Sequence, residues 1–326
     1  MRELLRPWPL AAIVAAFALG WGAWLLSGAT ACGTYDYVNA DVACGEQGIS
    51  KAGYVALRND ISRYIDEATS TGRAREVSVY YRDLRDGPSF GIGAGNEFAP
   101  ASLLKLPVII SFFSLNADEP GILEKKLRYD PATLDRQFDI ARQINFDFEG
   151  EELVSGQDYT VRELMEASIV YSDNYAYFTL LKYINLERPG GTAFVLETMQ
   201  ELGVIDPRTP EEETVNVRNY SSLFRLLYNA SFLSADDSEE VLGWLARASF
   251  DAGLKAGVPE NVVVASKFGE RQVDEDRRLH DCGIVYYPHN PYTLCVMTQG
   301  NDWAQLKTVI SDISAMVYKE VDSRAR

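Results

Sequence analysis

Between residues 50 and 92 the apolar positions follow first the period of a helix and then the period of a strand. Between residues 50 and 71 they recur every three or four positions, at Tyr54, Leu57, Ile61, Tyr64 and Ile65. This spacing predicts a helix with one apolar face. Over residues 76–84 apolar and polar side chains alternate, and residues 89–92 follow a Gly-Pro turn. These two segments are predicted to be strands joined by a short turn.

The middle of the chain, from Ser102 to about Phe250, has a mostly helical pattern. Helical spacing recurs over residues 103–115, 161–184, 192–202 and 220–233. Strand patterns return at 261–267, 283–287 and 292–298, and a last amphipathic helix covers 303–321. The order predicts an α+β fold, in which both ends of the chain build one antiparallel sheet of about five strands, flanked by helices. An all-helical insertion separates the two halves of that sheet.

The N-terminus has the pattern of an exported chain. Arg2 and Arg6 precede an uncharged segment, residues 7–31, that is long enough to span a bilayer. The segment ends in Ala29-Thr30-Ala31, a small-residue pattern typical of signal-peptide cleavage, and Cys32 follows directly. A transmembrane anchor, a cleaved signal peptide and a lipid-anchored cysteine therefore all stay open. The early arginines favour an extracytoplasmic position for the rest of the chain.

Composition and cysteine content agree with this location and exclude some partners. The formal net charge of −16 disfavours binding to nucleic acid, because an acidic protein repels phosphate backbones. Cys32 and Cys44 lie close together, where a disulfide is an option unless Cys32 is lipidated. Cys282 and Cys295 lie on successive predicted strands, but spacing alone does not fix the register that a bridge needs. No Cys/His spacing suggests a metal, and no cofactor is expected.

The first chemically informative motif is Ser102-Leu103-Leu104-Lys105, at the start of a predicted helix. A serine and a lysine three residues apart on a helix share one face. An amine whose pKa is lowered by burial or by nearby cations can take the proton of a serine hydroxyl. The unpaired backbone N–H groups of a helix start also favour developing negative charge. Most Ser-x-x-Lys pairs lie on the solvent-exposed surface of a helix. Apolar residues flank this pair on both sides, which argues against such a position.

Two further motifs follow at a distance. Ser172-Asp173-Asn174 offers a hydroxyl that can relay a proton and an amide that can hold an amide-like substrate. Taken alone, it is more often a polar turn or a helix cap. Lys267, followed by Phe268 and Gly269 at the end of a Val-rich strand, is suited to binding a carboxylate. Taken alone, it is an ordinary lysine at a strand end.

Together the three motifs resemble the S-x-x-K, S-D-N and K-T-G set of class A β-lactamases and penicillin-binding proteins. The resemblance runs from about Ser50 to the C-terminus, because the order of helices and strands is also that of the family. The residue pattern before it predicts a signal peptide or transmembrane anchor over 1–31 and an extracytoplasmic tether over 32–50. The catalytic domain would then cover 51–326, with a helical subdomain at about 102–250.

The resemblance also implies roles for individual residues. Ser102 would be the nucleophile, and Lys105 would accept or relay its proton. Ser172 would pass a proton to the leaving nitrogen. Asn174 would hold the side-chain amide of the substrate, and Lys267 would attract the substrate carboxylate.

The third motif completes the implied site and also departs from the family. The backbone N–H groups of Ser102 and Glu270 would form the oxyanion hole, with Glu270 directly after Gly269. Phe268 stands where the family has Thr or Ser, and a phenyl ring cannot donate a hydrogen bond to a substrate carboxylate. Arg271, like Arg277 and Arg278, lies downstream as a candidate replacement, although a solvated position is the simpler expectation for each.

A second departure concerns the water that would hydrolyse the acyl-enzyme. The family carries a Glu with a nearby Asn on a long loop after the S-D-N helices, whereas here the loop over residues 203–216 is short and has no E-x-x-L-N pattern. Glu213, or its neighbours Glu211 and Glu212, could supply this deacylation base. Three adjacent glutamates are, however, more typical of a solvated helix start.

Three functions therefore compete. The first is a monomeric serine β-lactamase. The second is a penicillin-binding D,D-peptidase that acts on D-alanyl peptides and releases β-lactams slowly, which the missing loop glutamate favours. The third is a non-catalytic wall-binding domain, which Phe268 favours. The two histidines, His280 and His289, lie outside the motifs and are expected to be structural.

Overall fold

The sheet of the computed structural model is built from both ends of the chain. The structure describes residues 36–38, 54–85, 88–138, 153–204 and 214–325. Its five strands are β1 (Glu76–Asp83), β2 (Ser89–Ile92), β5 (Val264–Val273), β6 (Asp276–Val285) and β7 (Tyr292–Gly300). They lie in the order β2-β1-β7-β6-β5, and every neighbouring pair is antiparallel. The predicted α+β fold and the origin of its sheet are confirmed.

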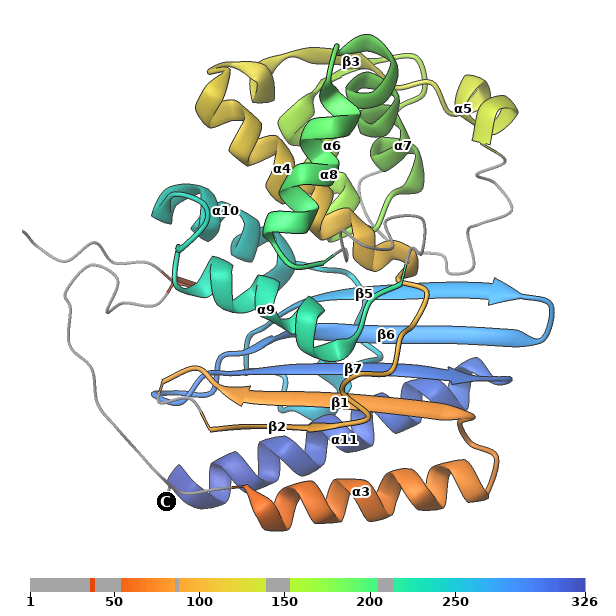
Figure 1. Ribbon diagram of the computed structural model, residues 1–326, viewed down its shortest axis with the longest axis vertical. Helices are drawn as coiled ribbons and strands as arrows, with labels where there is room; N and C mark the ends of the chain where they lie inside the picture. Colours follow the sequence, from red (N-terminus) through yellow and green to blue (C-terminus); the bar gives the residue numbers. More distant parts are fainter. Residues whose placement is uncertain (1–35, 39–53, 86–87, 139–152, 205–213, 326) are drawn as a thin grey trace, which may run out of the picture.

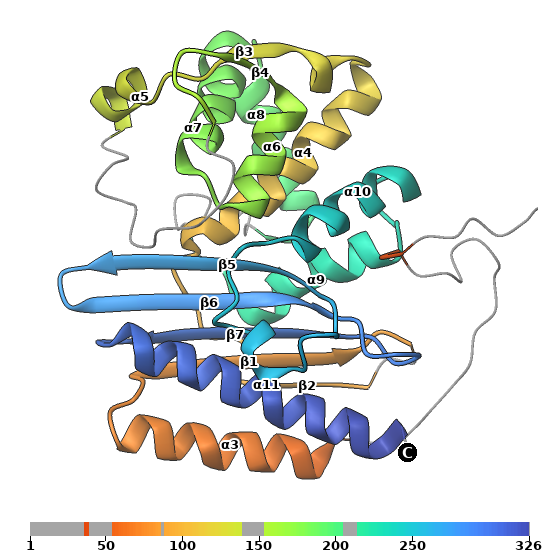
Figure 2. The same cartoon turned by 180° about the vertical axis from the view of Figure 1, so that it is seen from behind.

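Two helices cover one face of the sheet, and the helical insertion lies on the other (Figures 1 and 2). Helix α3 (Val55–Ser70) and helix α11 (Trp303–Ala325) pack side by side beneath the strands. Their apolar faces and the lower face of the sheet form one core cluster, which includes Ile61, Val79 and Ile313. This packing brings together the first and last helices of the described residues on the face of the sheet that their neighbouring strands build.

The insertion is mainly helical. Its helices are α4 (Lys105–Asp118), α5 (Pro131–Phe138), α6 (Val161–Val170), α7 (Asn174–Lys182), α8 (Gly191–Glu201), α9 (Val217–Tyr228) and α10 (Ala235–Ala246), with short helical segments η1 (Ala101–Leu104), η2 (Ile122–Glu124) and η4 (Tyr183–Glu187). The short segment η5 (Lys255–Gly257) follows the insertion and packs against α11. The insertion also contains a two-stranded sheet of β3 (Lys126–Arg128) and β4 (Asp158–Thr160), so the prediction of an all-helical insertion was wrong in this detail. Strands of three residues are too short to show a period of two.

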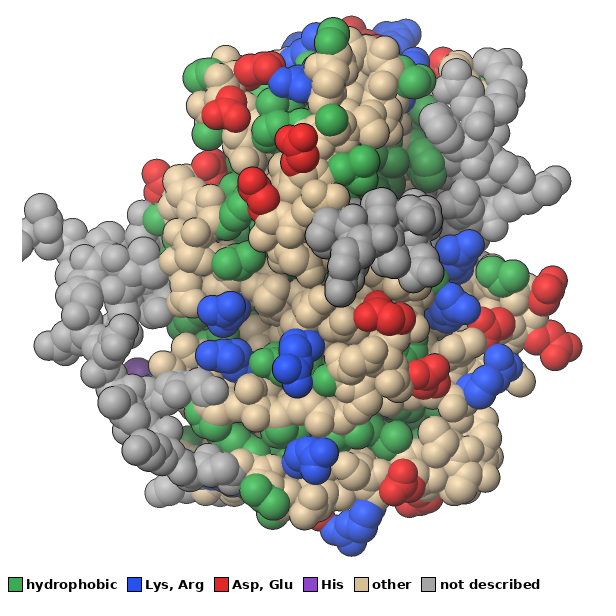
Figure 3. All heavy atoms as spheres, in the orientation of Figure 1, with side chains coloured by type: hydrophobic (Ala, Val, Ile, Leu, Met, Phe, Trp, Pro, Cys, Tyr) green, Lys and Arg blue, Asp and Glu red, His purple; other side chains and the backbone are tan. Residues whose placement is uncertain are grey.

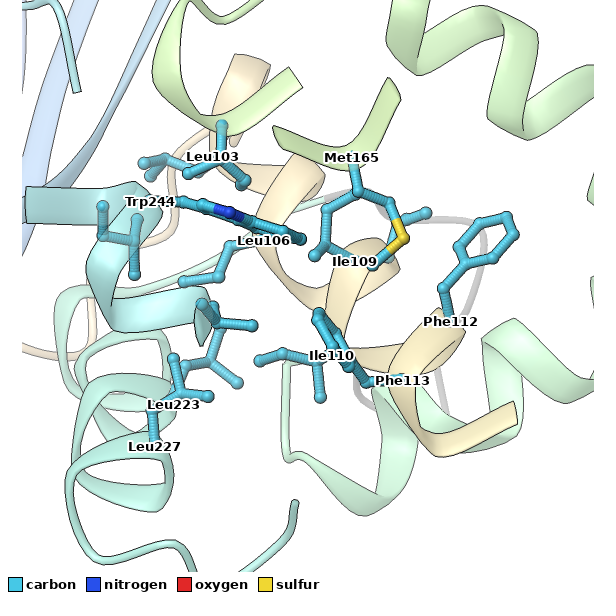
Figure 4. Packing of buried hydrophobic residues seen from close by; sticks show 14 of the residues in the cluster. Leu103, Leu106, Ile109, Ile110, Phe112, Phe113, Met165, Leu223, Leu227 and Trp244 are labelled. Carbon is cyan, nitrogen blue, oxygen red and sulfur yellow. The ribbon is translucent and has the colours of Figure 1, made fainter. Parts of the chain in front are cut away.

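Helix α4 lies at the centre of the insertion and is buried on nearly every side. Figure 4 shows its apolar side chains, among them Leu106 and Phe113, packed against Trp244 of α10 and Met165 of α6. Among the described residues, the stretch Ala101–Asp118 is long and apolar enough to cross a membrane. A helix enclosed by other helices is apolar all round for the same reason as a membrane span. Here the neighbouring helices account for the composition.

The hairpin of β5 and β6 is longer than the hydrophobic pattern predicts. Its pairing continues to Val273 and Asp276, beyond the predicted strands at 261–267 and 283–287. Residues 271–273 are exposed, and Asp274 at the turn has a positive φ of 53°. Since neither face of this part of the hairpin is buried, no alternation of polar and apolar residues marks it.

A disulfide joins the two central strands. Cys282 and Cys295 are directly opposite each other on β6 and β7, and their sulfur atoms are bonded. The spacing of the two cysteines in the sequence did not fix how β6 and β7 pair, and the pairing in the structure allows the disulfide. Cys32 and Cys44 lie outside the described residues, as does the predicted N-terminal span.

Gly269 allows β5 to approach the turn that carries Ser102. A Cβ atom at this position would lie 2.8 Å from the backbone oxygen of Pro100 and 2.9 Å from Cγ of Leu103. Those distances are shorter than van der Waals contact with a non-hydrogen atom permits. The close approach of β5 and η1 thus requires a residue without a side chain.

Replacing Gly269 with Ala should therefore push β5 away from η1. We expect the free energy of unfolding to fall by about 1–3 kcal/mol, the usual cost of overpacking. Urea denaturation measures this change. Gly95→Ala is the matched control, because a Cβ there meets nothing within 4 Å. Equal stabilities of the two variants would contradict the close-approach argument.

Candidate active site

Residues of the first two sequence motifs, and Glu270 directly after the third, line one cavity between the sheet and the helical insertion. The cavity has a volume of about 530 Å³. Its lining includes Ser102 and Lys105 from η1 and α4, Asn174 from α7, and Glu270 and Arg271 from β5. Residues far apart in the sequence thus come together where the end of β5 passes the start of α4.

Ser102 lies in the single turn η1, where contacts from the sheet and from α9 hold the backbone. The turn begins at Ala101, whose φ of 50° is uncommon for a residue with a Cβ atom. The hydroxyl of Tyr220 donates a hydrogen bond of 2.9 Å to the backbone oxygen of Leu103. Leu103 itself is fully buried, whereas Ser102 is partly exposed to the cavity. The turn therefore presents the serine from an anchored base.

His280 fixes the segment just before this turn. Its Nδ1 accepts a hydrogen bond of 3.3 Å from the backbone N–H of Thr298, so its Nε2 carries the proton and donates to the oxygen of Ala99 at 3.1 Å. Burial lowers the pKa of His280 to about 4, which keeps the ring neutral at pH 7. This histidine connects β6 to the approach of η1 and takes no part in the cavity.

The amine of Lys105 is buried among polar atoms of the second motif. It donates to the backbone oxygen of Ser172, contacts the Ser172 hydroxyl oxygen at 3.1 Å, and donates to Asn174 Oδ1 at 2.7 Å. Burial lowers the pKa of Lys105 to about 7, although the nearby carboxylates of Asp173 and Glu270 act in the opposite direction. Close to pH 7 a substantial fraction of this amine is therefore neutral and can accept a proton.

Ser172 occupies the sharp turn between α6 and α7, where a continuous helix over 161–184 was predicted. Its φ is 53°, a left-handed value that ends α6. Asp173 then caps α7 by accepting a hydrogen bond of 3.0 Å from the N–H of Ala176, and it also accepts one from the Tyr129 hydroxyl. The S-D-N motif is thus a helix cap and at the same time directs the Ser172 hydroxyl toward the lysines.

Lys267 approaches the same hydroxyl from the opposite side. Its amine is fully buried, lies 3.0 Å from the Ser172 hydroxyl oxygen, and donates to the backbone oxygen of Phe268 at 2.9 Å. The pKa of Lys267 is lowered well below its ordinary value, first by burial and then by the positive charge of Lys105. Because two ammonium groups so close together repel each other, the pair favours a state in which one amine is neutral.

The structure places Phe268 away from the cavity. Its ring is 3% exposed and stacks on Phe250 with 4.4 Å between ring centroids. It therefore belongs to the core beneath the sheet, and the Lys267 amine contacts both its backbone oxygen and its ring, whose centroid is 4.3 Å from the amine nitrogen. Glu213 lies outside the described residues.

The structure also brings in residues that the motif analysis did not assign. Tyr177 lines the cavity and places its ring 5.7 Å from the Lys105 amine. Its position one helical turn after Asn174 would have placed both on one face of α7. Of the three downstream arginines, Arg271 lines the cavity. Arg277 instead bonds the backbone oxygen of Asn301, and Arg278 pairs with Asp276.

The arrangement is suited to nucleophilic chemistry on a carbonyl. Ser102, at a helix start, lines the same cavity as an amine of lowered pKa, and the Ser172 hydroxyl connects that amine to a second one. Within the described residues, no group of three or more His, Cys, Asp or Glu side chains is placed to hold a metal ion.

Comparison with known proteins identifies the family. A model of the beta-lactamase enzyme family matches residues 56–321. The chain is also similar to a beta-lactamase of Amycolatopsis lactamdurans, with 26% identity over 234 residues that make up 68% of this chain and 72% of that protein.

Solved structures share the fold. PBP-A superposes with a TM-score of 0.66 and 22% identity, over 85% of this chain and all (100%) of that one. A beta-lactamase from Chitinophaga pinensis superposes with a TM-score of 0.65 and 19% identity, over 81% of this chain and 100% of that one. With the family model matching most of its length, the chain belongs to the beta-lactamase enzyme family.

Proposed function

We propose that the protein is a serine hydrolase that opens β-lactam rings through an acyl-enzyme on Ser102. The observation that carries this proposal is the buried Lys105 amine in the cavity that Ser102 also lines, with a pKa lowered to about 7. Neutral Lys105 takes the proton of the Ser102 hydroxyl as its oxygen attacks the carbonyl carbon of the lactam. The bond between that carbon and the ring nitrogen then breaks.

The leaving nitrogen needs a proton, and Ser172 is placed to supply it. Its hydroxyl lies 3.1 Å from the Lys105 amine and 3.0 Å from the Lys267 amine. The proton that Lys105 accepted can therefore return through Ser172 to the nitrogen. The negative charge on the carbonyl oxygen is stabilised by the backbone N–H groups of Ser102 and Glu270. Water then hydrolyses the ester and regenerates the serine.

Substrate binding is assigned to the polar lining of the cavity. Asn174 and the edge of β5 hold the substrate amide, and Lys267, when protonated, supplies positive potential toward its carboxylate. The ring of Phe268 lies in the core, so the family's hydroxyl is absent from this edge. Arg271, which lines the cavity, replaces that contact with a guanidinium that can bind a carboxylate through two hydrogen bonds.

A penicillin-binding D,D-peptidase with slow deacylation is the second candidate. It uses the same acylation step, and the short loop after α8 without an E-x-x-L-N pattern favours it. A solved variant of PBP-A with 22% identity, an acyl-enzyme complex with penicillin G, shares the fold. A non-catalytic domain is the third candidate. Burying two lysine amines next to each other is costly, and such a domain would gain nothing from it.

An extracytoplasmic location completes the proposal. The uncharged segment 7–31 and the preceding arginines support export and attachment to the membrane, and the catalytic domain acts as a monomer. The short segment 36–38 is bound to the domain: the backbone N–H groups of Asp36, Tyr37 and Val38 donate to the carboxylate of Glu239 on α10. This contact holds residues 36–38 against α10.

Pre-steady-state hydrolysis of nitrocefin tests the function and separates the candidates. A β-lactamase shows sustained turnover of nitrocefin, whether or not an initial burst of one equivalent of product precedes it. One equivalent followed by negligible turnover identifies the D,D-peptidase, and no reaction identifies the non-catalytic domain. Ser102→Ala should lower the rate at least about 10³-fold, because it removes the nucleophile. Ser114→Ala on the same helix is the control and should keep the wild-type rate.

Replacing Arg271 with Gln tests the carboxylate contact. We expect kcat/KM for benzylpenicillin to fall about 10- to 100-fold, mostly through KM, since a charge-assisted hydrogen bond contributes about 1.5–3 kcal/mol. The methyl ester of benzylpenicillin lacks the carboxylate, so its kcat/KM should change little. An equal loss for acid and ester would show that Arg271 does not contact the carboxylate.

A further inference from the structure

A second hollow lies on the upper face of the sheet, away from the candidate active site. It has a volume of about 220 Å³ and is bounded by β1 and α9. Its lining shares no residue with the larger cavity and includes Tyr80, Arg82, Arg218, Ser221 and Arg225.

Three guanidinium groups converge on this hollow. Arg82 comes from β1, while Arg218 and Arg225 are seven residues apart on α9, so they lie two turns apart on one helix face. Figure 3 shows Lys and Arg side chains gathered at this level of the molecule, between α9 and β1. Such a cluster is unusual in a chain whose formal net charge is −16.

None of the three arginines pairs with a carboxylate among the described residues. Arginines elsewhere do: Arg247, for example, pairs with Glu166 at 2.8 Å. The carboxylate of Glu97, close to the start of α9, accepts a hydrogen bond from Asn216 instead.

Neutral donors line the floor of the hollow. Ser221 is 2% exposed and lines the hollow, and its hydroxyl forms no hydrogen bond within the described part of the chain. A hydroxyl without a protein partner can donate a hydrogen bond to a ligand oxygen. The neighbouring Ser222 differs, because its hydroxyl already donates to the oxygen of Asn219. Arg218 lies over the ring of Tyr80, 5.9 Å from its centroid, which limits the positions of its guanidinium.

We propose that this hollow is a binding site for a negatively charged phosphate group. The three arginines have no counter-charge among the described residues, so they repel one another, and an anion between them removes that repulsion. Planar guanidinium groups match the oxygen pairs of a phosphate through two parallel hydrogen bonds. The hollow holds a phosphate or diphosphate, either from a soluble phosphate ester or from a lipid headgroup. This inference does not depend on the acyl-serine chemistry.

Calorimetric titration with pyrophosphate at constant ionic strength tests the site. Wild-type protein should bind at one site. Arg225→Gln should weaken the Kd by at least about tenfold, and Arg82→Gln with Arg225→Gln by at least about a hundredfold, since each removes a charge-assisted contact. Ser221→Ala should weaken the Kd by a smaller factor. Thermal unfolding without ligand checks that each variant is folded.

Arg63→Gln is the matched control, because it removes the same charge from an exposed site on α3 that is paired with Asp60. Its Kd should equal that of the wild type. Sedimentation with phosphatidylglycerol and phosphatidylcholine vesicles distinguishes the two phosphate sources. Binding to phosphatidylglycerol alone that needs Arg225 identifies a lipid headgroup, and binding of soluble pyrophosphate identifies a free ester. No binding to either probe, or an equal loss in Arg63→Gln, would overturn the proposal.

Discussion

The rest of the site depends on the burial of two lysine amines around one serine hydroxyl. Lys105 and Lys267 both contact the Ser172 hydroxyl oxygen and are almost completely enclosed. A buried ammonium group loses its hydration, so burial lowers the pKa of both amines, and their mutual repulsion adds to the effect for Lys267. The same burial that makes these lysines costly for folding makes a neutral amine available near pH 7.

The fold keeps this arrangement in place from three directions. Lys105 is carried by a helix that is itself buried, Ser172 by a turn with a left-handed backbone, and Lys267 by an edge strand that passes the serine turn at a glycine. Asp281, buried on β6, accepts a hydrogen bond from the N–H of Leu254 and supplies negative charge toward Lys267. Burial raises the pKa of Asp281 to about 6, so it remains ionised at neutral pH. The chemistry of the site thus depends on the packing of the core in the helical insertion and of the core beneath the sheet.

Much of this could be predicted from the sequence, because periodicity and motif spacing report on buried faces. The five-stranded sheet and the contacts of Ser172 with Lys105 and Lys267 are of this kind. The sequence predictions that failed concern features that depend on three-dimensional context. A substitution inside a motif suggests a changed site, but the alternation of a strand turns the Phe268 ring into the core.

Other features carry no periodic signal at all. The exposed end of the β5–β6 hairpin buries neither face, and the three-residue strands β3 and β4 are too short to show a pattern. The arginine hollow joins Arg82 to a helix more than a hundred residues away, which only the tertiary structure brings close. Arg271 could be named from its position, but its place in the cavity follows from the register of β5.

The central claim is that neutral Lys105 accepts the Ser102 proton, and the pH dependence of acylation tests it most directly. The rate constant for acylation by nitrocefin, measured by stopped flow, should rise about tenfold per pH unit at low pH. It should level off above the Lys105 pKa of about 7, because protonation of the amine removes the base. A rate that keeps rising toward the ordinary pKa of lysine, about 10.4, or that does not change with pH, would contradict the account.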